Sequence, residues 1–554
     1  MANLTPFDSE RFLGNVFRVG PSEVRVDLTG CQQDPTGKKS FQAHLGSYVV
    51  LGSGEYALFG QIHDISLSDP NSATEDGNSK ATGLIELFSS IHLETGKVTP
   101  GIAYSPGIGD SVYAPTSEFV QYVVTGQDDG TTAIRLDLAQ LPDASQTVLA
   151  VTPEKLFGRH CAILGATGGG KSWTLARIVE EAARFNCKII LVDATGEYAG
   201  LDCHTQHLHF GQDAEEGEDS TQVSLPFYHL TEQDLFAIFR PHGPSQSPKL
   251  RAAMKSLKLA KVSSSVGIDG LIIKAHKPKT QYERSYQHHL EEIDNPYATF
   301  DIRSLTRQIE NECIDPQRSS TEPDVWGGIN ATDLANCMPM IGRINDILQS
   351  PNLAPIFKPG KKPSLLEEIH RFIRSKEKRV LRINMQFLSF AHGAREIIAN
   401  AIARHMFELA QKGCFVKRPL LVVLDEAHQF LNPELSRQDS DFPLDAFGLI
   451  AKEGRKYSMN ICLATQRPRD IPEDVLSQMG TMIVHRLIND QDRAIIERAC
   501  GEVDQSSIRL IPSLGPGEAV MAGVAFPVPV HIRVIAPDCR PRSEGANYQR
   551  FWQT

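Results

Sequence analysis

Residues Gly165–Ser172 read Gly-Ala-Thr-Gly-Gly-Gly-Lys-Ser, which matches the pattern G-x-x-x-x-G-K-[ST] of a phosphate-binding loop. An apolar segment typical of a buried strand, CAILG at 161–165, leads into this loop, and a helical segment, SWTLARIVEEAARF at 172–185, follows it. Glycines let backbone N–H groups close around phosphates, and the N-terminus of the following helix attracts their negative charge. The stretch therefore predicts a nucleotide site on a sheet of alternating strands and helices. The alternative, a glycine turn with an incidental lysine, does not account for this context.

Two side chains of the loop carry the expected nucleotide chemistry. We expect the ammonium of Lys171 to reach the β- and γ-phosphates of ATP, and the hydroxyl of Ser172 to ligate Mg²⁺. The predicted nucleotide-binding residues are Gly165, Ala166, Thr167, Gly168, Gly169, Gly170, Lys171, Ser172 and Trp173.

An acidic pair follows a second buried strand. The apolar run Leu420–Leu424 leads directly to Asp425 and Glu426. Ligands bind at the carboxyl edge of a parallel sheet, so both acids should face the nucleotide. We expect Asp425 to hold Mg²⁺ through water, as the second metal-binding residue beside Ser172, and Glu426 to orient or deprotonate the attacking water. This pair favours ATP hydrolysis over ATP binding alone.

Four further residues are candidates for catalysis or positioning. The strand-like segment NICLATQ ends at Gln466, whose amide we expect to contact the γ-phosphate; a polar cap on the strand end is the alternative. In oligomeric ATPases an arginine often reaches the γ-phosphate of a neighbouring subunit. Arg455, in a charged turn, is the first candidate for that role, and Arg159 is the second. Asp193, at the end of KIILVD, is expected either to position magnesium or to cap its own turn.

The composition is that of a globular protein with several domains. The chain has 554 residues, of which 41% are hydrophobic and 22% are charged, with a net charge of −11. This balance excludes a basic nucleic-acid coat, although it allows a local basic lining. The sequence has no long apolar run, no secretory signal and no C-x-x-C motif. We therefore expect a cytoplasmic protein without a membrane segment or a zinc site.

The pattern of strands and helices divides the chain into five segments. Residues 1–140 contain short β-type runs, including SYVVLGSGEYALFGQI and EFVQYVV, which are typical of a small β-barrel or sandwich. Strands alternate with helices at 141–230 and 351–510, which predicts the two parts of an ATPase core. Residues 231–350 predict a helical insert, and residues 511–554 predict a strand-like brace.

Five motifs in this order resemble the HerA helicase/translocase family, which is related to the FtsK motors. They are GRHCAILGATGGGKSWT, VDATGEY, LLVVLDEAHQFL, EGRKYSMNICLATQRP and GEAVMAG, and the resemblance covers most of the chain. It implies an α/β fold with a RecA-like P-loop ATPase core, an N-terminal small β-barrel of the HAS-barrel type and a helical insert.

The resemblance also implies a function. It implies a homo-hexameric motor, driven by ATP and Mg²⁺, that translocates on or unwinds double-stranded DNA in a central channel. Because no nuclease signature appears in the sequence, DNA cutting would need a partner, such as a NurA-type nuclease, or a sirtuin-like or other effector in antiphage defence. One alternative is a nucleotide-dependent ring scaffold that activates an effector without productive translocation. Another is a motor for a different polymer, like the secretion and conjugation ATPases, which usually carry membrane segments.

Two basic stretches are candidates for DNA contact. They are KLRAAMKSLKLAK at 249–261 and IRSKEKR at 373–379. Lysine and arginine bind DNA phosphates whatever the net charge of the protein, and a ring would repeat each stretch six times. For both stretches, a solvated helix face is the favoured alternative.

Overall fold

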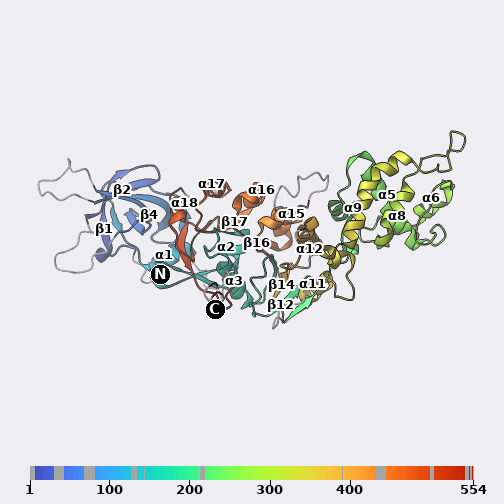
Figure 1. Ribbon diagram of the computed structural model, residues 1–554. Coiled ribbons are helices and arrows are strands. Elements are labelled where there is room, and N and C mark those ends of the chain that lie inside the picture. The colour runs from blue at the N-terminus through green and yellow to red at the C-terminus, as the bar shows by residue number, and fades with distance from the viewer. Residues whose placement is uncertain are drawn as a thin grey trace. The chain divides into compact units, whose positions relative to one another are not determined.

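The computed structural model describes two compact units of the chain. One unit comprises Met1–Cys187, Gly200–Cys203 and Asn460–Thr554, and the other comprises Lys188–Ala199 and His204–Met459 (Figure 1). We call them the first and the second unit. The described residues are 6–29, 43–67, 81–125, 134–142, 144–211, 219–389, 391–431, 444–499, 505–542, 548 and 552.

The first unit begins with a closed barrel of six strands. Leu13, Val26, Leu51 and Ile62 lie in its apolar interior. The pairing order is β2-β1-β7-β3-β4-β5, and a further pairing of β2 with β5 closes the barrel. The strands are β1 (Phe12–Val19), β2 (Glu23–Asp27), β3 (Tyr48–Ser53), β4 (Tyr56–Leu67), β5 (Ala81–His92) and β7 (Ser111–Tyr113), while β6 (Val98–Pro100) extends the edge of β5. The predicted small β-barrel is therefore confirmed.

One segment of the predicted β region is a helix. EFVQYVV lies in α1 (Ser117–Thr125), and the strand prediction for it was wrong. The side chain of Thr116 accepts a hydrogen bond from the Phe119 N–H, which is a local cap. Phe119, Val120, Val123 and Val124 are buried, and this spacing places one apolar face of a helix against the core.

The rest of the first unit is a mixed sheet around the phosphate loop. β10 (His160–Leu164) pairs in parallel with β16 (Met459–Thr465) and β17 (Met479–His485). From β17 the sheet continues in antiparallel order through β18 (Glu518–Gly523), β19 (Val530–Val534), β8 (Leu136–Leu141) and β9 (Ala144–Val151). β8 therefore crosses the predicted domain border at residue 140 and pairs within the sheet that holds β10.

The second unit contains a parallel sheet of five strands. Their order is β13 (Ser220–Gln222), β12 (Thr205–His209), β14 (Val380–Asn384), β11 (Lys188–Asp193) and β15 (Leu420–Leu424). Every residue of β11, β14 and β15 is buried, as in a parallel sheet covered on both faces. α12 (Ala394–Gln411) has a largely buried sequence and packs against α15 (Ala446–Glu453).

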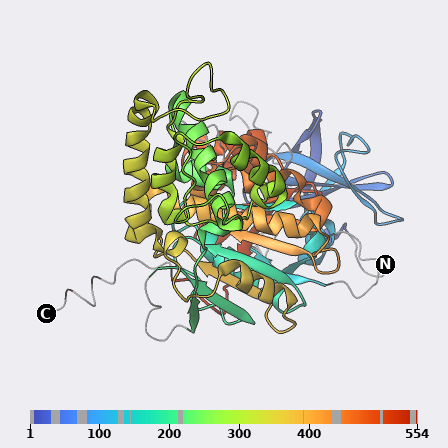
Figure 2. The same cartoon turned by 90° about the vertical axis from the view of Figure 1, so that its right-hand side faces the viewer.

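The predicted insert consists of helices in the structure. A capping box of Thr231 and Asp234 begins α4 (Glu232–Phe239). α5 (Gly243–Val262), α8 (Leu305–Glu312) and α9 (Ala331–Gln349) pack on one another, and α6 (Lys279–His288) and α7 (Leu290–Asp294) complete the group, drawn in green to yellow in Figures 1 and 2. Among the described residues, no helix combines the length and apolar character needed to cross a membrane.

The basic residues of α5 bind groups within the insert. Lys255, for example, lies 3.1 Å from the carboxylate of Asp294 and donates to the Tyr286 hydroxyl. Each of Lys249, Arg251, Lys255, Lys258 and Lys261 has a partner of this kind, including Asp333, Glu232, the Ile293 carbonyl and the Thr299 hydroxyl. Arg251 and Lys261 are exposed, which agrees with the favoured interpretation of 249–261 as a solvated face, although the basic side chains of α5 also bind groups on neighbouring segments.

Candidate nucleotide site

The phosphate loop lies between β10 and α3 (Lys171–Ala183), as predicted. Gly168 and Gly170 have φ angles of +76° and +114°, which residues other than glycine rarely adopt. A Cβ atom on Gly165 would lie 2.6 Å from the Cβ of His485. The glycines are therefore required both by the curvature of the loop and by its close packing.

Lys171 lies beside the loop with its ammonium near the path of the backbone. It is mostly buried, and its Nζ donates a hydrogen bond of 3.1 Å to the Ala166 carbonyl. This hydrogen bond places the ammonium against the loop that is expected to bind the phosphates. Ser172 follows it in the first turn of α3.

Gln466 lies next to the loop. Leu164 and Thr465 are register partners in β10 and β16, so both strands end at the same edge of the sheet. The hydroxyl of Thr167 donates a hydrogen bond of 2.6 Å to Oε1 of Gln466. The structure thus brings the predicted γ-phosphate contact to the phosphate loop.

His485, which the sequence reasoning missed, lies under the loop. Its Nδ1 is 2.8 Å from the Glu518 carbonyl and its Nε2 is 2.8 Å from the Thr174 hydroxyl. Burial lowers the pKa of His485 to about 4, so the ring is neutral at pH 7. It donates from Nδ1 and accepts at Nε2. A histidine at the end of an apolar strand carries no sequence signal for this role.

The loop also contacts the C-terminal part of the chain. The Gly517 N–H donates to the Gly169 carbonyl at 3.2 Å, and a Cβ on Gly170 would lie 3.1 Å from the Gly517 Cα. The predicted brace therefore includes a turn that supports the phosphate loop.

The acidic residues of the second unit gather at the carboxyl ends of β11 and β15. Asp425 is buried, and the hydroxyl of Thr195 donates to its Oδ2 at 3.3 Å. Burial raises the pKa of Asp425 well above its usual value, and the negative charges of Asp193, Glu426 and Glu197 raise it further. A buried carboxylate among like charges is a favourable ligand for a cation, and oxygen donors are those that Mg²⁺ prefers.

Glu426 has an unusual backbone conformation. Its φ of +47° lies in the left-handed region, which costs a residue other than glycine about 1–3 kcal/mol. Its Oε2 lies 3.2 Å from Nδ1 of His428. Strained residues of this kind cluster at active sites, which agrees with the expected role of Glu426.

Asp193 caps its own turn. Its Oδ1 accepts from the Gly196 N–H at 2.7 Å, and its Oδ2 accepts from the Tyr198 N–H and from Nε of the buried Arg382. Of the two roles considered for Asp193, the capping role is the one that these bonds perform. Arg382 was not anticipated, because its partner lies on a neighbouring strand 189 residues away.

The two candidate arginines lie before their strands. Arg159 directly precedes β10, so an extended strand of roughly 17 Å separates it from the phosphate loop of the same chain. Arg455 is exposed on the turn η8 (Gly454–Tyr457), which precedes β16. Both positions are at the amino ends of strands, whereas the loop and Gln466 follow carboxyl ends.

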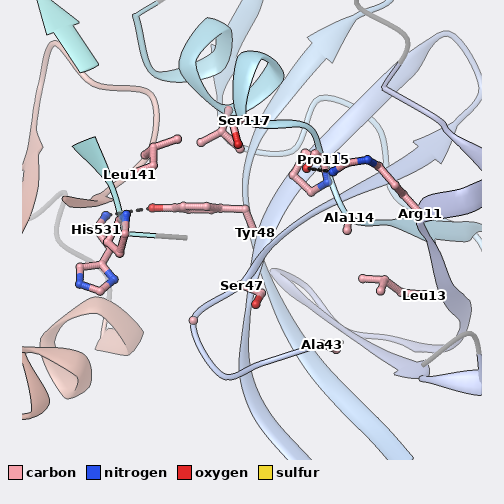
Figure 3. Close-up of a pocket in the computed structure, with 13 residues that line it drawn as sticks. Arg11, Leu13, Ala43, Ser47, Tyr48, Ala114, Pro115, Ser117, Leu141 and His531 are labelled. Carbon is pink, nitrogen blue, oxygen red and sulfur yellow. Dashed lines mark hydrogen bonds between the residues drawn. The ribbon is translucent and has the colours of Figure 1, made fainter. Parts of the chain in front are cut away.

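A cavity of about 290 Å³ lies elsewhere in the first unit, where the barrel meets β19. Figure 3 shows Tyr48 pointing from the barrel toward His531, whose backbone N–H donates to the Tyr48 hydroxyl at 2.9 Å. Arg11 donates to the Pro115 carbonyl on another side of the cavity. The cavity contains none of the predicted nucleotide residues, and its polar groups join the barrel to the sheet.

A phosphate-binding loop after a buried parallel strand, with an acidic pair after another, defines this chain as a P-loop ATPase. The model of one family, described as the central domain of helicase HerA, matches residues 136–321. The DNA double-strand break repair helicase HerA of Pyrococcus furiosus is 24% identical over 438 residues, which cover 77% of this chain and 73% of that protein. The probable helicase MJ1565 of Methanocaldococcus jannaschii is 23% identical over 425 residues, or 76% of this chain and 70% of that protein. The resemblance to the HerA helicases is therefore confirmed.

Among solved structures, the plasmid coupling protein TrwB in complex with the ATP analogue ADPNP is similar with a TM-score of 0.44 and 13% sequence identity. The similarity covers 77% of this chain and 93% of that protein. VirB4 of Thermoanaerobacter pseudethanolicus has a TM-score of 0.42, with 13% identity over 77% of this chain and all of that protein.

Proposed function

We propose that this HerA-like ATPase is a motor that translocates on or unwinds double-stranded DNA, and that it works as a homo-hexamer. The observation that supports the proposal is the position of the residues expected to hydrolyse ATP, which lie at strand ends. The phosphate loop follows β10, Gln466 follows β16, and Asp425 and Glu426 follow β15. Several of the similar proteins, including the one from Pyrococcus furiosus, are named as DNA double-strand break repair helicases, which favours DNA as the substrate.

In the proposed mechanism, the loop backbone from Gly165 to Gly170 and the Lys171 ammonium bind the phosphates of ATP. Ser172 and Asp425 would hold Mg²⁺, which neutralises charge on the β- and γ-phosphates when it is bound. Glu426 accepts a proton from the attacking water. The water oxygen bonds to the γ-phosphorus while the bond from that phosphorus to the β–γ bridging oxygen breaks, which leaves ADP and phosphate. Gln466 donates to the γ-phosphoryl oxygens, and Arg455 or Arg159 does so from the neighbouring subunit.

The proposal extends to partners and location. DNA cutting would come from a separate protein, a NurA-type nuclease or a sirtuin-like or other defence effector, and the complex would act in the cytoplasm in DNA end processing or antiviral defence. Such a partner is needed for DNA cutting because the proposed catalytic residues of this chain act on ATP and do not cut the phosphodiester bonds of DNA.

ATP turnover with and without duplex DNA, measured at several salt concentrations, tests the proposal. A motor should be stimulated by DNA, and the stimulation should fall steeply with salt, because phosphate contacts release counterions. Lys171→Ala is the control for hydrolysis by a contaminant. Sedimentation of the same samples should show six subunits. Turnover that is independent of DNA would reject the motor and favour the ring scaffold.

A further inference from the structure

The C-terminal segment Asp538–Arg540 lies against the helix that follows the phosphate loop. The carboxylate of Glu180, on α3, accepts the Cys539 N–H at 2.6 Å and the Asp538 N–H at 3.0 Å. Glu180 is mostly buried, and it is held in place by the helix whose first turn contains Lys171. Two charge-assisted hydrogen bonds to adjacent N–H groups fix the position of the backbone, and therefore of the next residue, Arg540.

The guanidinium of Arg540 lies over the indole ring of Trp173, with 5.6 Å between its central carbon and the ring centroid. Trp173 directly follows Ser172 in the first turn of α3 and is half-buried. Arg540 is exposed. An aromatic ring thus directly follows the two residues expected to bind phosphates and magnesium, and a planar cation lies over that ring.

We propose that Trp173 and Arg540 bind the nucleobase of ATP. This inference rests on the proposed function of the loop as the triphosphate site. Because the loop and Lys171 take the phosphates, the sugar and base extend beyond the first turn of α3. Trp173 is the next residue of that turn after Lys171 and Ser172, which are expected to bind the phosphates and Mg²⁺. Glu180 is a positioning residue, because it holds the segment that carries Arg540.

The chemistry of the pair defines what it recognises. An indole face and a guanidinium plane attract any flat, electron-rich ring by stacking and cation–π contact, and stacking on an aromatic side chain contributes about 1–3 kcal/mol per base. Neither contact reads the hydrogen-bonding edge of a base. The site should therefore distinguish a nucleoside triphosphate from a bare triphosphate, while it binds ATP and GTP within several-fold of each other.

The test compares ATP with inorganic tripolyphosphate as competitors for a fluorescent ATP analogue on the full-length protein. Trp173→Ala should weaken ATP binding about 5- to 150-fold, in line with the loss of one stacked base. Tripolyphosphate binding should stay within about 2-fold, since it has no base. Trp173→Phe should restore most of the ATP affinity. Arg540→Ala and Glu180→Gln should weaken ATP binding in the same selective way but by less.

Trp326→Phe, in the insert, and Arg184→Ala, at the far end of α3, are the matched controls and should bind both compounds like the unmodified chain. If Trp173→Ala weakens both compounds equally, the ring shapes the loop and does not bind the base, and the proposal fails. Unchanged ATP affinity in Trp173→Ala also overturns it. If the unmodified chain binds neither compound, the triphosphate site itself is wrong, which is a different result.

Discussion

The hydroxyl of Thr167 and Oε1 of Gln466 lie 2.6 Å apart, although 299 residues separate them in the sequence. The hydrogen bond joins the tip of the phosphate loop to the residue that follows β16. The carbonyl oxygen of the Gln466 amide accepts this hydrogen bond, and the NH₂ group of the same amide is its hydrogen-bond donor. We expect that NH₂ group to donate to the γ-phosphate of a nucleotide bound in the loop.

Replacing Gln466 by Glu should separate ATP binding from turnover. A carboxylate still accepts from Thr167 but cannot donate to the γ-phosphoryl oxygens, and it adds repulsion there. We expect turnover to fall by about 10²-fold, as when one donor to a developing charge is removed, while ATP affinity changes much less. Thr167→Val is the control for the hydrogen bond alone and should have a small effect. Equal turnover in Gln466→Glu and the unmodified chain would assign Gln466 to strand capping.

Replacing Glu426 by Gln should give a protein that binds ATP but hydrolyses it slowly. Removal of a general base costs a factor on the order of 10²–10⁴ in rate. Lys171→Ala, in contrast, should weaken nucleotide binding as well. ATP affinity and turnover measured on both variants decide between these outcomes. Near-normal turnover in Glu426→Gln would move the catalytic base to another residue.

Mixing two inactive variants should reveal the arginine that acts in trans. Arg455→Ala and Lys171→Ala each lack one half of a shared site, so a mixed ring restores some intact interfaces and part of the ATPase activity. Removal of a trans arginine costs about 10³-fold or more, and Arg455→Lys should also be impaired because lysine lacks the planar fork. A native gel must show that the two variants co-assemble before the recovered ATPase activity is interpreted. A mixture of Arg159→Ala with Lys171→Ala tests the second candidate. If ATPase activity returns only in that mixture, Arg159 rather than Arg455 acts in trans.

Stability should fall in mild acid because of His485. Its pKa is about 4 in the folded chain and about 6.5 when the residue is exposed. Between these values the unfolded chain binds more protons, so this contribution to the free energy of unfolding is complete above pH 6.5 and is lost as the pH falls toward 4. The loss is roughly 3 kcal/mol at most. Urea unfolding at pH 7, 6 and 5 should show a steeper decline in the unmodified chain than in His485→Gln, whereas parallel curves would contradict the assignment.

Local patterns explain what could be predicted from the sequence. The phosphate loop, the strands β10, β11, β15 and β16, and the acidic pair after β15 are continuous motifs, so the residues near each one identify it. EFVQYVV was misread because β-branched and aromatic residues favour a strand, while the Thr116 cap and one buried face favour a helix.

Contacts between distant segments explain what was missed. Which strands and helices become neighbours decides the contacts of His485, of Arg382 and of the α5 lysines. No local sequence pattern predicts those neighbours. The same holds for the roles proposed for Arg159 and Arg455, because a contact with a neighbouring subunit leaves no pattern in the sequence of one chain.

The pairing of β8 with β19 bears on how fragments of this protein would behave. Arg533 and Val534 pair with Gln140 and Ala139, and the Ile535 N–H donates to the Leu138 carbonyl. A fragment cut at the apparent border after residue 140 would lose β8 and expose β19 as an unprotected edge strand. Such edges recruit strands from other molecules. An isolated ATPase fragment would then aggregate by edge-to-edge pairing of strands. The size of such aggregates would carry no information about the oligomeric state of the full-length protein.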